Sequence, residues 1–249
     1  MDRVLVIPDA QIPNHNVNSW NVILKFAKFY KPTEVIILGD FIDLNSLSNY
    51  QKLSENENAT LDYEIESTNK ELDKLDKIKS INKKIYLLGN HEYRYELYKV
   101  NNWCKEVKHL RNLTSIEEEL NLTKRGYITF KYGDIYQKGH AVFTHGWFIN
   151  KYHAVKTLRR FFKNIYYGHT HGWQAFSTLG LDGNPVEAVS CGCICKTTID
   201  YLKGKPPDWV QMWMYAEFFR DGTYYPHFAK IINGKTFEYG REFNGLEKT

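Results

Sequence analysis

The chain has 249 residues, of which 43% are hydrophobic, and this is enough for one large core in a single domain. The formal net charge of +4 is compatible with an anionic substrate but does not by itself indicate nucleic-acid binding. Because the sequence has neither an apolar run of the roughly 20 residues that span a bilayer nor the start of a signal peptide, we expect a cytoplasmic protein without a membrane partner.

The first half of the chain alternates β-branched runs with helical patterns. Residues 4–7 and 35–38 read as buried strands, and residues 20–29 between them have the apolar spacing of a helix. This order predicts parallel strands, because a strand, a crossover helix and a second strand form a right-handed unit. A helical insert over about 45–83 is expected to cover one face of the sheet, and residues 85–88 read as the third strand.

The second half of the chain is rich in strand patterns. The segments that read as strands are residues 127–130, 141–143 and 164–167. Residues 154–162 read as a helix, and β-hairpins are expected over about 209–243, where Asp-Gly and Asn-Gly dipeptides favour turns. The pattern therefore predicts one α/β domain over residues 1–249, with two β-sheets packed together and helices outside.

Three cysteines alternate near the end of this region, at Cys191, Cys193 and Cys195. An extended segment would place all three on one face, and we interpret them as small apolar residues that face the core. A zinc site is the alternative, but it normally needs ligands on a turn.

Five apolar runs end in clusters of metal-binding side chains. The clusters are Asp9-Ala10-Gln11, Gly39-Asp40, Gly89-Asn90-His91-Glu92, His145-Gly146 and Gly168-His169-Thr170-His171. We expect them to converge at one edge of a sheet, because each is placed where a strand gives way to a loop. Oxygen ligands and imidazoles from separate strands build sites for two divalent metals, so phosphate-ester hydrolysis is the leading reaction.

The clusters divide into ligands for two ions. Asp40 is the candidate bridging carboxylate, and Asp9 and His171 are expected to bind the first ion. The expected ligands of the second ion are Asn90, His145 and His169. Any one of these residues alone would more often be an ordinary loop residue, whereas the five clusters in this order argue against chance.

His91 is expected to face the substrate instead of a metal ion, because it directly follows Asn90. An imidazole in that position can protonate the leaving-group oxygen. Asp43 and Glu92 are candidate carboxylates that orient an imidazole through its other ring nitrogen. A helix-capping or surface role is the alternative for His91 and Glu92.

Basic and aromatic residues flank the clusters. Candidate phosphate contacts, each alternatively a solvated helix residue, are Arg94, Lys156, Arg159 and Arg160. Aromatic faces stack bases, and the candidate rings are Trp147, Phe148, Tyr152 and Trp173. The alternative for these rings is packing in the core or at the contact of a homodimer.

These residues resemble the calcineurin-like metallophosphoesterase superfamily, whose pattern is Asp-x-His, Gly-Asp-x-x-Asp, Gly-Asn-His-(Asp/Glu), a lone His and Gly-His-x-His. The match runs from Asp9 to His171, and the run Glu92-Tyr93-Arg94 is most similar to phage or prophage members, which would act in the host cytoplasm. The resemblance implies a four-layer αββα sandwich of two mixed β-sheets flanked by helices. It also implies a dinuclear centre that often holds manganese, iron or zinc.

Two positions depart from the superfamily pattern. Gln11 stands where the superfamily usually has histidine, and its amide oxygen is a weaker ligand for zinc or iron than an imidazole. We therefore expect Gln11 to bind the first ion with a bias to manganese or magnesium; the alternatives are a loosely held or an absent first ion. Leu44 stands where the protein Ser/Thr phosphatase branch has arginine, which counts against a protein phosphatase.

The expected function is a metal-dependent phosphoester hydrolase with two divalent ions, Mn²⁺ in preference to iron, zinc or magnesium. A hydroxide bridging the two ions would attack phosphorus in line, with His91 assisting the leaving group. The preferred activity is that of a phosphodiesterase or nuclease on nucleic acid or nucleotides. The alternatives are a phosphomonoesterase acting on a nucleotide or small phosphate, and a metal-binding scaffold without catalysis, which only Gln11 supports.

Overall fold

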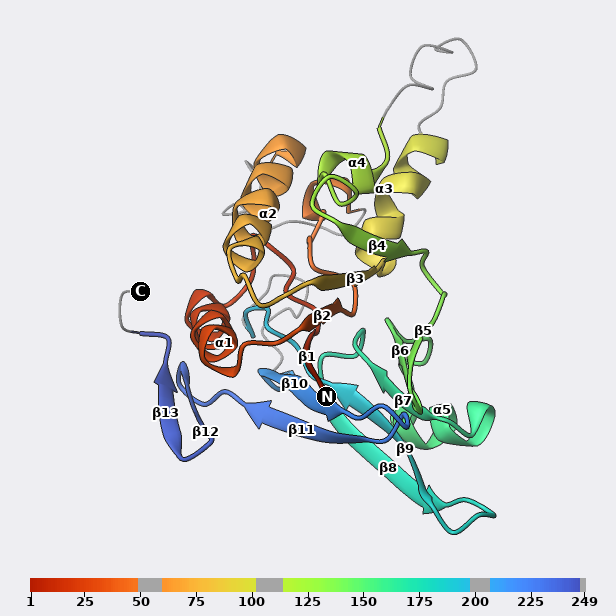
Figure 1. Cartoon of the computed structure of the whole chain (residues 1–249). Helices are drawn as coiled ribbons and strands as arrows, with labels where there is room; N and C mark the ends of the chain where they lie inside the picture. The colour runs from red at the N-terminus through yellow and green to blue at the C-terminus, as the bar shows by residue number, and fades with distance from the viewer. Residues whose placement is uncertain (49–59, 102–113, 198–206, 247–249) are drawn as a thin grey trace.

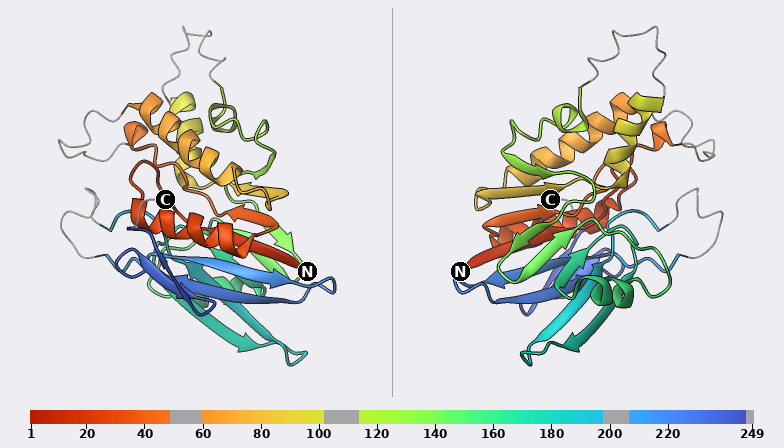
Figure 2. Two further views of the ribbon diagram at one scale, coloured as in Figure 1. Left: turned by 60° about the vertical axis from the view of Figure 1, so that its left-hand side comes forward. Right: turned by 90° about the vertical axis from the view of Figure 1, so that its right-hand side faces the viewer.

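Two mixed β-sheets pack face to face between helices (Figure 1). The computed structural model describes residues 1–48, 60–101, 114–197 and 207–246. The first sheet has six strands in the order β11-β10-β1-β2-β3-β4, and the second has five in the order β5-β6-β7-β9-β8. Side views separate the layers, with helices beyond the outer face of each sheet (Figure 2). The predicted four-layer αββα sandwich is confirmed.

The first half of the chain builds four strands of the first sheet and most of the helices. Its elements are β1 (Asp2–Ile7), α1 (Val17–Tyr30), β2 (Glu34–Ile37), the 3-10 helix η1 (Asn45–Leu47), α2 (Leu61–Asp76), β3 (Lys83–Leu87), α3 (Asn90–Asn101), α4 (Ile116–Glu119) and β4 (Tyr127–Phe130). Strands β1, β2, β3 and β4 run parallel, as the strand-helix-strand order predicts for the first two.

The second half supplies the second sheet and then returns to the first. Its elements are β5 (Tyr136–Lys138), β6 (Ala141–Thr144), α5 (His153–Phe161), β7 (Asn164–Tyr167), β8 (Trp173–Leu179), β9 (Pro185–Cys191), β10 (Met212–Phe218), β11 (Tyr224–Lys230), β12 (Lys235–Glu238) and β13 (Arg241–Asn244). In the second sheet β6, β7 and β9 are parallel, so both sheets have a parallel centre.

The alternation of side chains along β1 shows how the layers are held. Leu5 and Ile7 belong to the apolar cluster shared with α1 and α2, whereas Val4 and Val6 belong to the cluster between the two sheets. Because successive side chains of a strand point to opposite faces, one run of four apolar residues fills two cores. A third cluster, which includes Leu158, joins α5 to the second sheet.

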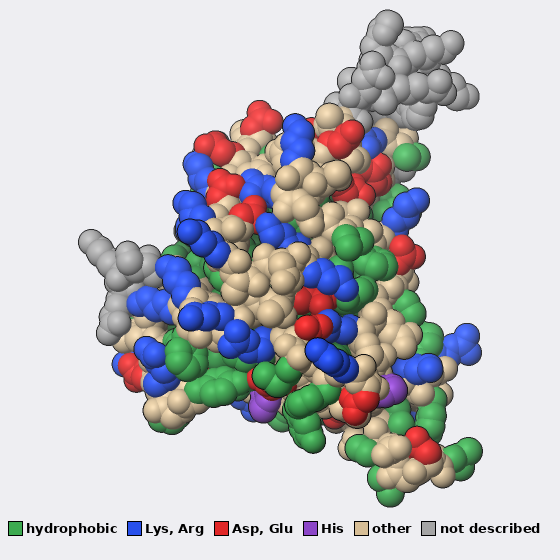
Figure 3. Space-filling view, in the orientation of Figure 1, with side chains coloured by type: hydrophobic (Ala, Val, Ile, Leu, Met, Phe, Trp, Pro, Cys, Tyr) green, Lys and Arg blue, Asp and Glu red, His purple; other side chains and the backbone are tan. Residues whose placement is uncertain are grey.

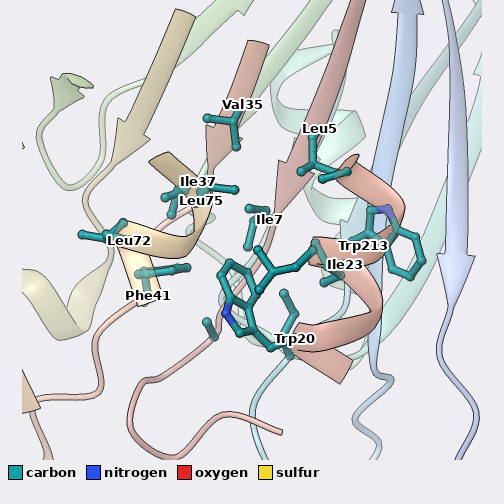
Figure 4. Close-up of a cluster of buried hydrophobic side chains, with 14 of the residues drawn as sticks. Leu5, Ile7, Trp20, Ile23, Val35, Ile37, Phe41, Leu72, Leu75 and Trp213 are labelled. Atoms are coloured by element: carbon teal, nitrogen blue, oxygen red, sulfur yellow. The ribbon is translucent and has the colours of Figure 1, made fainter. Parts of the chain in front are cut away.

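Helix α1 covers the first sheet with a face of buried apolar residues (Figure 4). Asn16 caps its start by accepting a hydrogen bond from the Ser19 amide at 3.1 Å, which satisfies one of the free donors of the first turn. Trp20 is fully buried, and its indole nitrogen donates to Glu71 of α2 at 2.7 Å. The two helices are therefore tied together on the same side of the sheet.

The predicted helical insert contains η1 and α2, and part of it, residues 49–59, lies outside the described residues. Leu72 and Leu75 of α2 are buried against the first sheet, with Leu61 and Ile65 partly buried beside them. The apolar stripe of this segment therefore packs on the sheet, as expected.

The hairpin predicted at the Asp-Gly turn is confirmed as β10 and β11, whereas the chain after β11 differs from the prediction. Ile232 and Lys235 form a single antiparallel bridge around the Asn-Gly turn, but β12 then pairs with β13 and not with β11. This separate pair packs against α1, where Phe243 joins the apolar core. Strands β12 and β13 therefore bury apolar surface against α1 and do not extend the first sheet. Among the described helices, none is both long enough and apolar enough to cross a bilayer.

Candidate metal centre

The predicted ligand clusters follow the carboxyl ends of strands from both sheets. Asp9 and Gln11 follow β1, Asp40 follows β2, and Asn90 begins α3 directly after β3. In the second sheet, His145 follows β6, and the segment of His169 and His171 follows β7. Because β1, β2 and β3 are parallel, as are β6 and β7, these ends meet at one edge of the sandwich.

One group of ligand atoms gathers around His145. Asp40, His145 and His169 each place one potential ligand atom within 4.8 Å of the others. The Nε2 atom of His145 lies 2.8 Å from Asn90 Oδ1 and 3.4 Å from Asp40 Oδ2. The three residues expected for the second ion are thus brought together with the expected bridging residue, Asp40.

A second group gathers on the other side of Asp40. Asp9, Asp40 and His171 also offer ligand atoms within 4.8 Å of one another, and His171 Nε2 lies 3.4 Å from Asp9 Oδ1. Asp40 is the member common to both groups. A carboxylate with two oxygens in this position is suited to bridge two ions.

Gln11 lies beside His171 in the group that contains Asp9, where a cation would complete its contacts. The side-chain amide nitrogen of Gln11 lies 3.3 Å from His171 Nε2, and Gln11 is almost wholly buried. Its Oε1 atom is buried and has no hydrogen-bond partner among the described residues. An unpaired buried amide oxygen is costly, and oxygen coordination to a divalent ion would remove that cost. The donor set at this position therefore fits a hard cation such as Mn²⁺ or Mg²⁺.

The two buried imidazoles are oriented through their Nδ1 atoms. His145 Nδ1 donates to the Leu38 carbonyl at 2.8 Å, which leaves Nε2 as the metal-facing atom. His171 Nδ1 faces the Cys195 sulfur at 3.6 Å. Sulfur thus takes the place of the oxygen acceptor that usually fixes a metal-binding histidine.

All three alternating cysteines are buried, as expected, but they do not share one face, and Cys193 and Cys195 form with His171 a further group of potential metal ligands. Strand β9 ends at Cys191, which packs in the core between the sheets, and Gly192 then adopts a φ of +70°. This turn of the backbone breaks the alternation, so Cys193 and Cys195 are buried beside His171. No local signal in the sequence marks this contact, because it joins loops that follow β7 and β9.

The charges of the site depend on one another. Burial disfavours the ionised form of Asp40, but the charges of His145 and His91 outweigh it and hold the pKa of this carboxyl well below its usual range. Burial likewise opposes protonation of His145, yet the charge of Asp40 raises its pKa to about 9. The pKa of His171 is also raised to about 9, against burial, by its hydrogen bond to Asp9.

His169 differs from the other two imidazoles. Burial, followed by the charge of His145, lowers its pKa to about 4. His169 therefore stays neutral at physiological pH, which is the form that binds a metal ion.

His91 lies beside Asp40 and is held by Asp43, as the sequence predicts for an oriented imidazole. Its Nδ1 atom lies 2.6 Å from the Asp43 carbonyl and 3.1 Å from a carboxylate oxygen of the same residue. Its Nε2 atom lies 3.6 Å from Asp40 Oδ2. Burial disfavours the charged ring, but the nearby charge of Asp40 prevails and the pKa of His91 is raised.

Glu92 has a different role from the one expected. No hydrogen bond joins Glu92 to an imidazole among the described residues; instead it accepts from backbone amides of both ligand loops. Its oxygens accept from the amides of Asp40 at 2.9 Å, Phe41 at 2.9 Å and Gly89 at 2.8 Å, and from the Tyr86 hydroxyl at 2.8 Å. Glu92 therefore fixes the Gly39-Asp40 loop against the Gly89-Asn90 loop.

The glycines of the motifs allow the close approach of these loops. A Cβ atom on Gly89 would overlap the carboxylate of Asp40, and a Cβ atom on Gly168 would overlap that of Asp9. A Cβ atom on Gly39 would lie 2.8 Å from His145 Nδ1. These three positions therefore require glycine because a ligand side chain occupies the space.

The predicted phosphate contacts are placed unequally. Arg94 donates from Nη1 to the carbonyls of Asp43 at 3.2 Å and Leu44 at 3.1 Å, so one part of its guanidinium holds the loop next to His91. Lys156, Arg159 and Arg160 are exposed on α5, the helix that packs against the second sheet. Of the four, Arg94 alone has a hydrogen bond to a predicted site residue within the described parts of the chain.

The predicted aromatic residues are largely engaged elsewhere. Trp147 packs on Phe161 with ring centroids 4.7 Å apart, and the Lys156 ammonium lies 4.2 Å from the Phe148 ring centre. Lys230 lies 4.0 Å from the ring centre of Trp173, and Tyr152 is exposed next to α5. The aromatic side chain that contacts His145 is Tyr132, at a centroid separation of 6.1 Å, and no motif in the sequence identified it.

Comparisons with known proteins give a family match and several structural neighbours. A family model described as Calcineurin-like phosphoesterase matches residues 2–192. A single mutant of Vps29 from Entamoeba histolytica is 14% identical with a TM-score of 0.47, covering 97% of this chain and 98% of that chain. Vps29 from Chaetomium thermophilum is 12% identical with a TM-score of 0.47, covering 94% and 93%. Vacuolar Protein Sorting 29 from Cryptosporidium parvum is 14% identical with a TM-score of 0.45, covering 92% and 97%. A comparison with curated proteins finds no match.

Proposed function

The chain belongs to the calcineurin-like phosphoesterase family, and we propose that it hydrolyses phosphodiesters of nucleic acid or nucleotides at a centre for two divalent metal ions. The observation that carries the proposal is the position of Asp40, which is common to two groups of potential ligands. One group adds Asp9 and His171, and the other adds His145 and His169. This arrangement supports two adjacent ions and not one.

The residues that would hold the ions divide around Asp40. Asp9, Gln11 and His171 are suited to the first ion, and Asn90, His145 and His169 to the second. When bound, two divalent ions supply Lewis-acid polarisation of the phosphoryl oxygens and lower the pKa of water to near neutrality. Because Gln11 contributes an oxygen where an imidazole is usual, we propose Mn²⁺ as the preferred metal.

His91 is proposed as the general acid for the leaving-group oxygen. Asp43 accepts from Nδ1, so the proton that His91 can give to a substrate is on Nε2, the atom that faces Asp40. The charge of Asp40 raises the pKa of His91, despite the opposing effect of burial, and so favours the protonated ring. Proton donation by a positioned imidazole typically contributes about 10²- to 10⁴-fold to a rate.

The distribution of cationic side chains favours a diester over a monoester. A monoester dianion carries more charge at phosphorus than a diester monoanion, so it gains more from additional Lys or Arg contacts. Arg94 already uses Nη1 for the carbonyls of Asp43 and Leu44, and Lys156 contacts Phe148. Figure 3 shows one face of the molecule, on which Lys and Arg side chains are interspersed with Asp and Glu side chains.

The test is a substrate panel with purified protein and Mn²⁺. The substrates are bis-p-nitrophenyl phosphate, p-nitrophenyl phosphate and labelled oligonucleotides. We expect turnover of the diesters, and a loss of about 10²- to 10⁴-fold in kcat for His91→Ala with unchanged metal content. His227→Ala is the matched control, because this histidine is exposed on β11 and bonded to Glu217.

The panel also separates the alternatives. Turnover of the monoester alone would replace this proposal with a phosphomonoesterase. Equal, low activity in the wild-type protein and in His91→Ala, with metal bound in both, would instead indicate a metal-binding scaffold.

A further inference from the structure

Two tyrosine rings form an exposed stack next to the metal centre. The rings of Tyr93 and Tyr132 lie 5.4 Å apart at an interplanar angle of 27°, and Tyr132 also meets the ring of His145 edge-on at 6.1 Å. Tyr93 is 43% exposed and Tyr132 is 37% exposed. The stack therefore begins at a predicted ligand of the second ion and extends to the solvent.

Each ring is positioned by a segment that also positions a residue of the centre. The Tyr93 amide donates to the Gly89 carbonyl at 3.0 Å in the first turn of α3, the turn that carries Asn90 and His91. Tyr93 therefore has a fixed place relative to these two side chains.

Tyr132 lies in a tight turn between β4 and β5. The Asp134 amide donates to the Lys131 carbonyl at 2.9 Å, and the Asp134 carboxylate accepts from the Lys131 amide at 3.0 Å. The Thr144 hydroxyl donates to the Asp134 carbonyl at 3.2 Å, and Thr144 directly precedes His145. The turn that presents Tyr132 is thus hydrogen-bonded to the strand that presents the ligand.

The two rings have no evident structural role in the core. Among the described residues, the three clusters of buried apolar side chains include neither Tyr93 nor Tyr132. Of the rings that the sequence suggested for stacking, Trp147 packs on Phe161, and Trp173 is 43% exposed and contacts Lys230. A rigid, exposed aromatic stack beside a phosphate site is the arrangement that binds a base without reading its sequence.

We propose that Tyr93 and Tyr132 form a binding subsite for the nucleobase of a nucleotide whose phosphate lies at Asp40 and His145. The inference rests on the proposed function to the extent that it places a phosphate at this centre. The subsite selects esters that carry an aromatic base over esters of the same charge without one. It recognises the base by its flat face, so purines and pyrimidines are both accepted.

The test measures binding and not hydrolysis. The 5′-phosphonate of 5′-deoxythymidine has a P–C bond in place of the ester bond, and methylphosphonate has the same charged head without a base. Their dissociation constants are measured calorimetrically in the presence of Mn²⁺ for the wild-type protein and for Tyr93→Ala, Tyr132→Ala and Tyr132→Phe. Tyr225→Ala is the matched control, because Tyr225 is an exposed tyrosine on β11 that also contacts another ring, Phe219.

We expect the wild-type protein to bind the nucleoside phosphonate about 5- to 150-fold more tightly than methylphosphonate, the range that one stacked base provides. Either alanine variant should lose most of this preference while still binding methylphosphonate, which also shows that the centre remains folded. Tyr132→Phe and Tyr225→Ala should keep the preference, because each leaves the stack of rings in place.

Equal affinity for the two ligands in the wild-type protein would overturn the subsite, as would binding of neither ligand. A preference that survives both alanine substitutions would overturn it as well. A clear preference in a protein that hydrolyses none of the phosphoesters would contradict the proposed function and leave the subsite standing.

Discussion

Replacement of Glu92 by glutamine tests how the two ligand loops are held together. Glu92 is fully buried, and its Oε2 atom accepts from the amides of Asp40 and Gly89. Its Oε1 atom accepts from the amides of Phe41 and Ile42 and from the Tyr86 hydroxyl. In Glu92→Gln one of the two oxygens becomes an NH₂ group, so two backbone amides face another donor and lose their acceptor, whichever oxygen is replaced, whereas the Tyr86 hydroxyl can turn to accept.

The expected cost follows from those two donors. An unsatisfied buried donor costs about 1–3 kcal/mol, so two cost about 2–6 kcal/mol. Burial raises the pKa of Glu92, and repulsion from the charge of Asp40 raises it further. The substitution removes this repulsion. This relief offsets part of the loss, and we expect the free energy of unfolding to fall by about 3 kcal/mol.

Urea unfolding of the metal-free protein measures this change directly. For a slope near 3 kcal/mol per M, the midpoint should fall by about 1 M, and Mn²⁺ should bind more weakly because the loop of Asp40 is released. Tyr86→Phe is the control, because it removes one hydroxyl, should cost about 1 kcal/mol and should leave Mn²⁺ affinity unchanged. An unchanged midpoint and unchanged Mn²⁺ affinity in Glu92→Gln would refute the reasoning.

Three further predictions concern single contacts of the centre. Gly168→Ala places a Cβ atom on the Asp9 carboxylate and should selectively weaken binding of the first Mn²⁺ ion. If a Mn²⁺ titration of this variant shows two sites of equal affinity, the contact between residue 168 and Asp9 does not limit metal binding. Cys195→Ala removes the acceptor of His171 Nδ1 and should weaken Mn²⁺ binding about 10- to 100-fold. Cys195→Ser should keep most of the Mn²⁺ affinity, because the serine hydroxyl can also accept. Equal Mn²⁺ affinities in the two variants would exclude an orienting role for the thiol. The raised pKa of His145, about 9 in the metal-free protein against 6.5 for a free ring, contributes stability that is complete below pH 6.5 and lost as the pH rises through 9. Mn²⁺ must displace this proton, so calorimetry in buffers of different ionisation enthalpy should detect proton release between pH 6.5 and 9, and its absence would show that the His145 ring is neutral before metal binds.

The sequence predicts the strands that carry the ligands because they are buried on both faces. Residues 4–7 read as a continuous apolar run, and this run is β1, with side chains in two cores. The ligand positions follow from such strands, since parallel strands bring their carboxyl ends to one edge. The resemblance to phage members stays a prediction.

Contacts between distant loops are the part that sequence patterns miss. Glu92 accepts from the backbone amides of Asp40, Phe41 and Ile42, which lie 50 to 52 residues away. Because every residue type except proline has a backbone amide, the sequence does not reveal these contacts. Cys195 reaches His171 only because Gly192 turns the chain after β9. Tyr132 meets His145 through a turn whose residues match no motif.

The number and coupling of bound Mn²⁺ ions test the shared position of Asp40 most directly. Electron paramagnetic resonance of the protein titrated with Mn²⁺ should reveal two ions per chain that are magnetically coupled, because ions bridged in a two-metal site lie about 3.5–4 Å apart. Asp40→Asn should abolish the coupling and weaken both ions. One ion per chain, or two ions without coupling, would contradict a centre in which Asp40 bridges both metals.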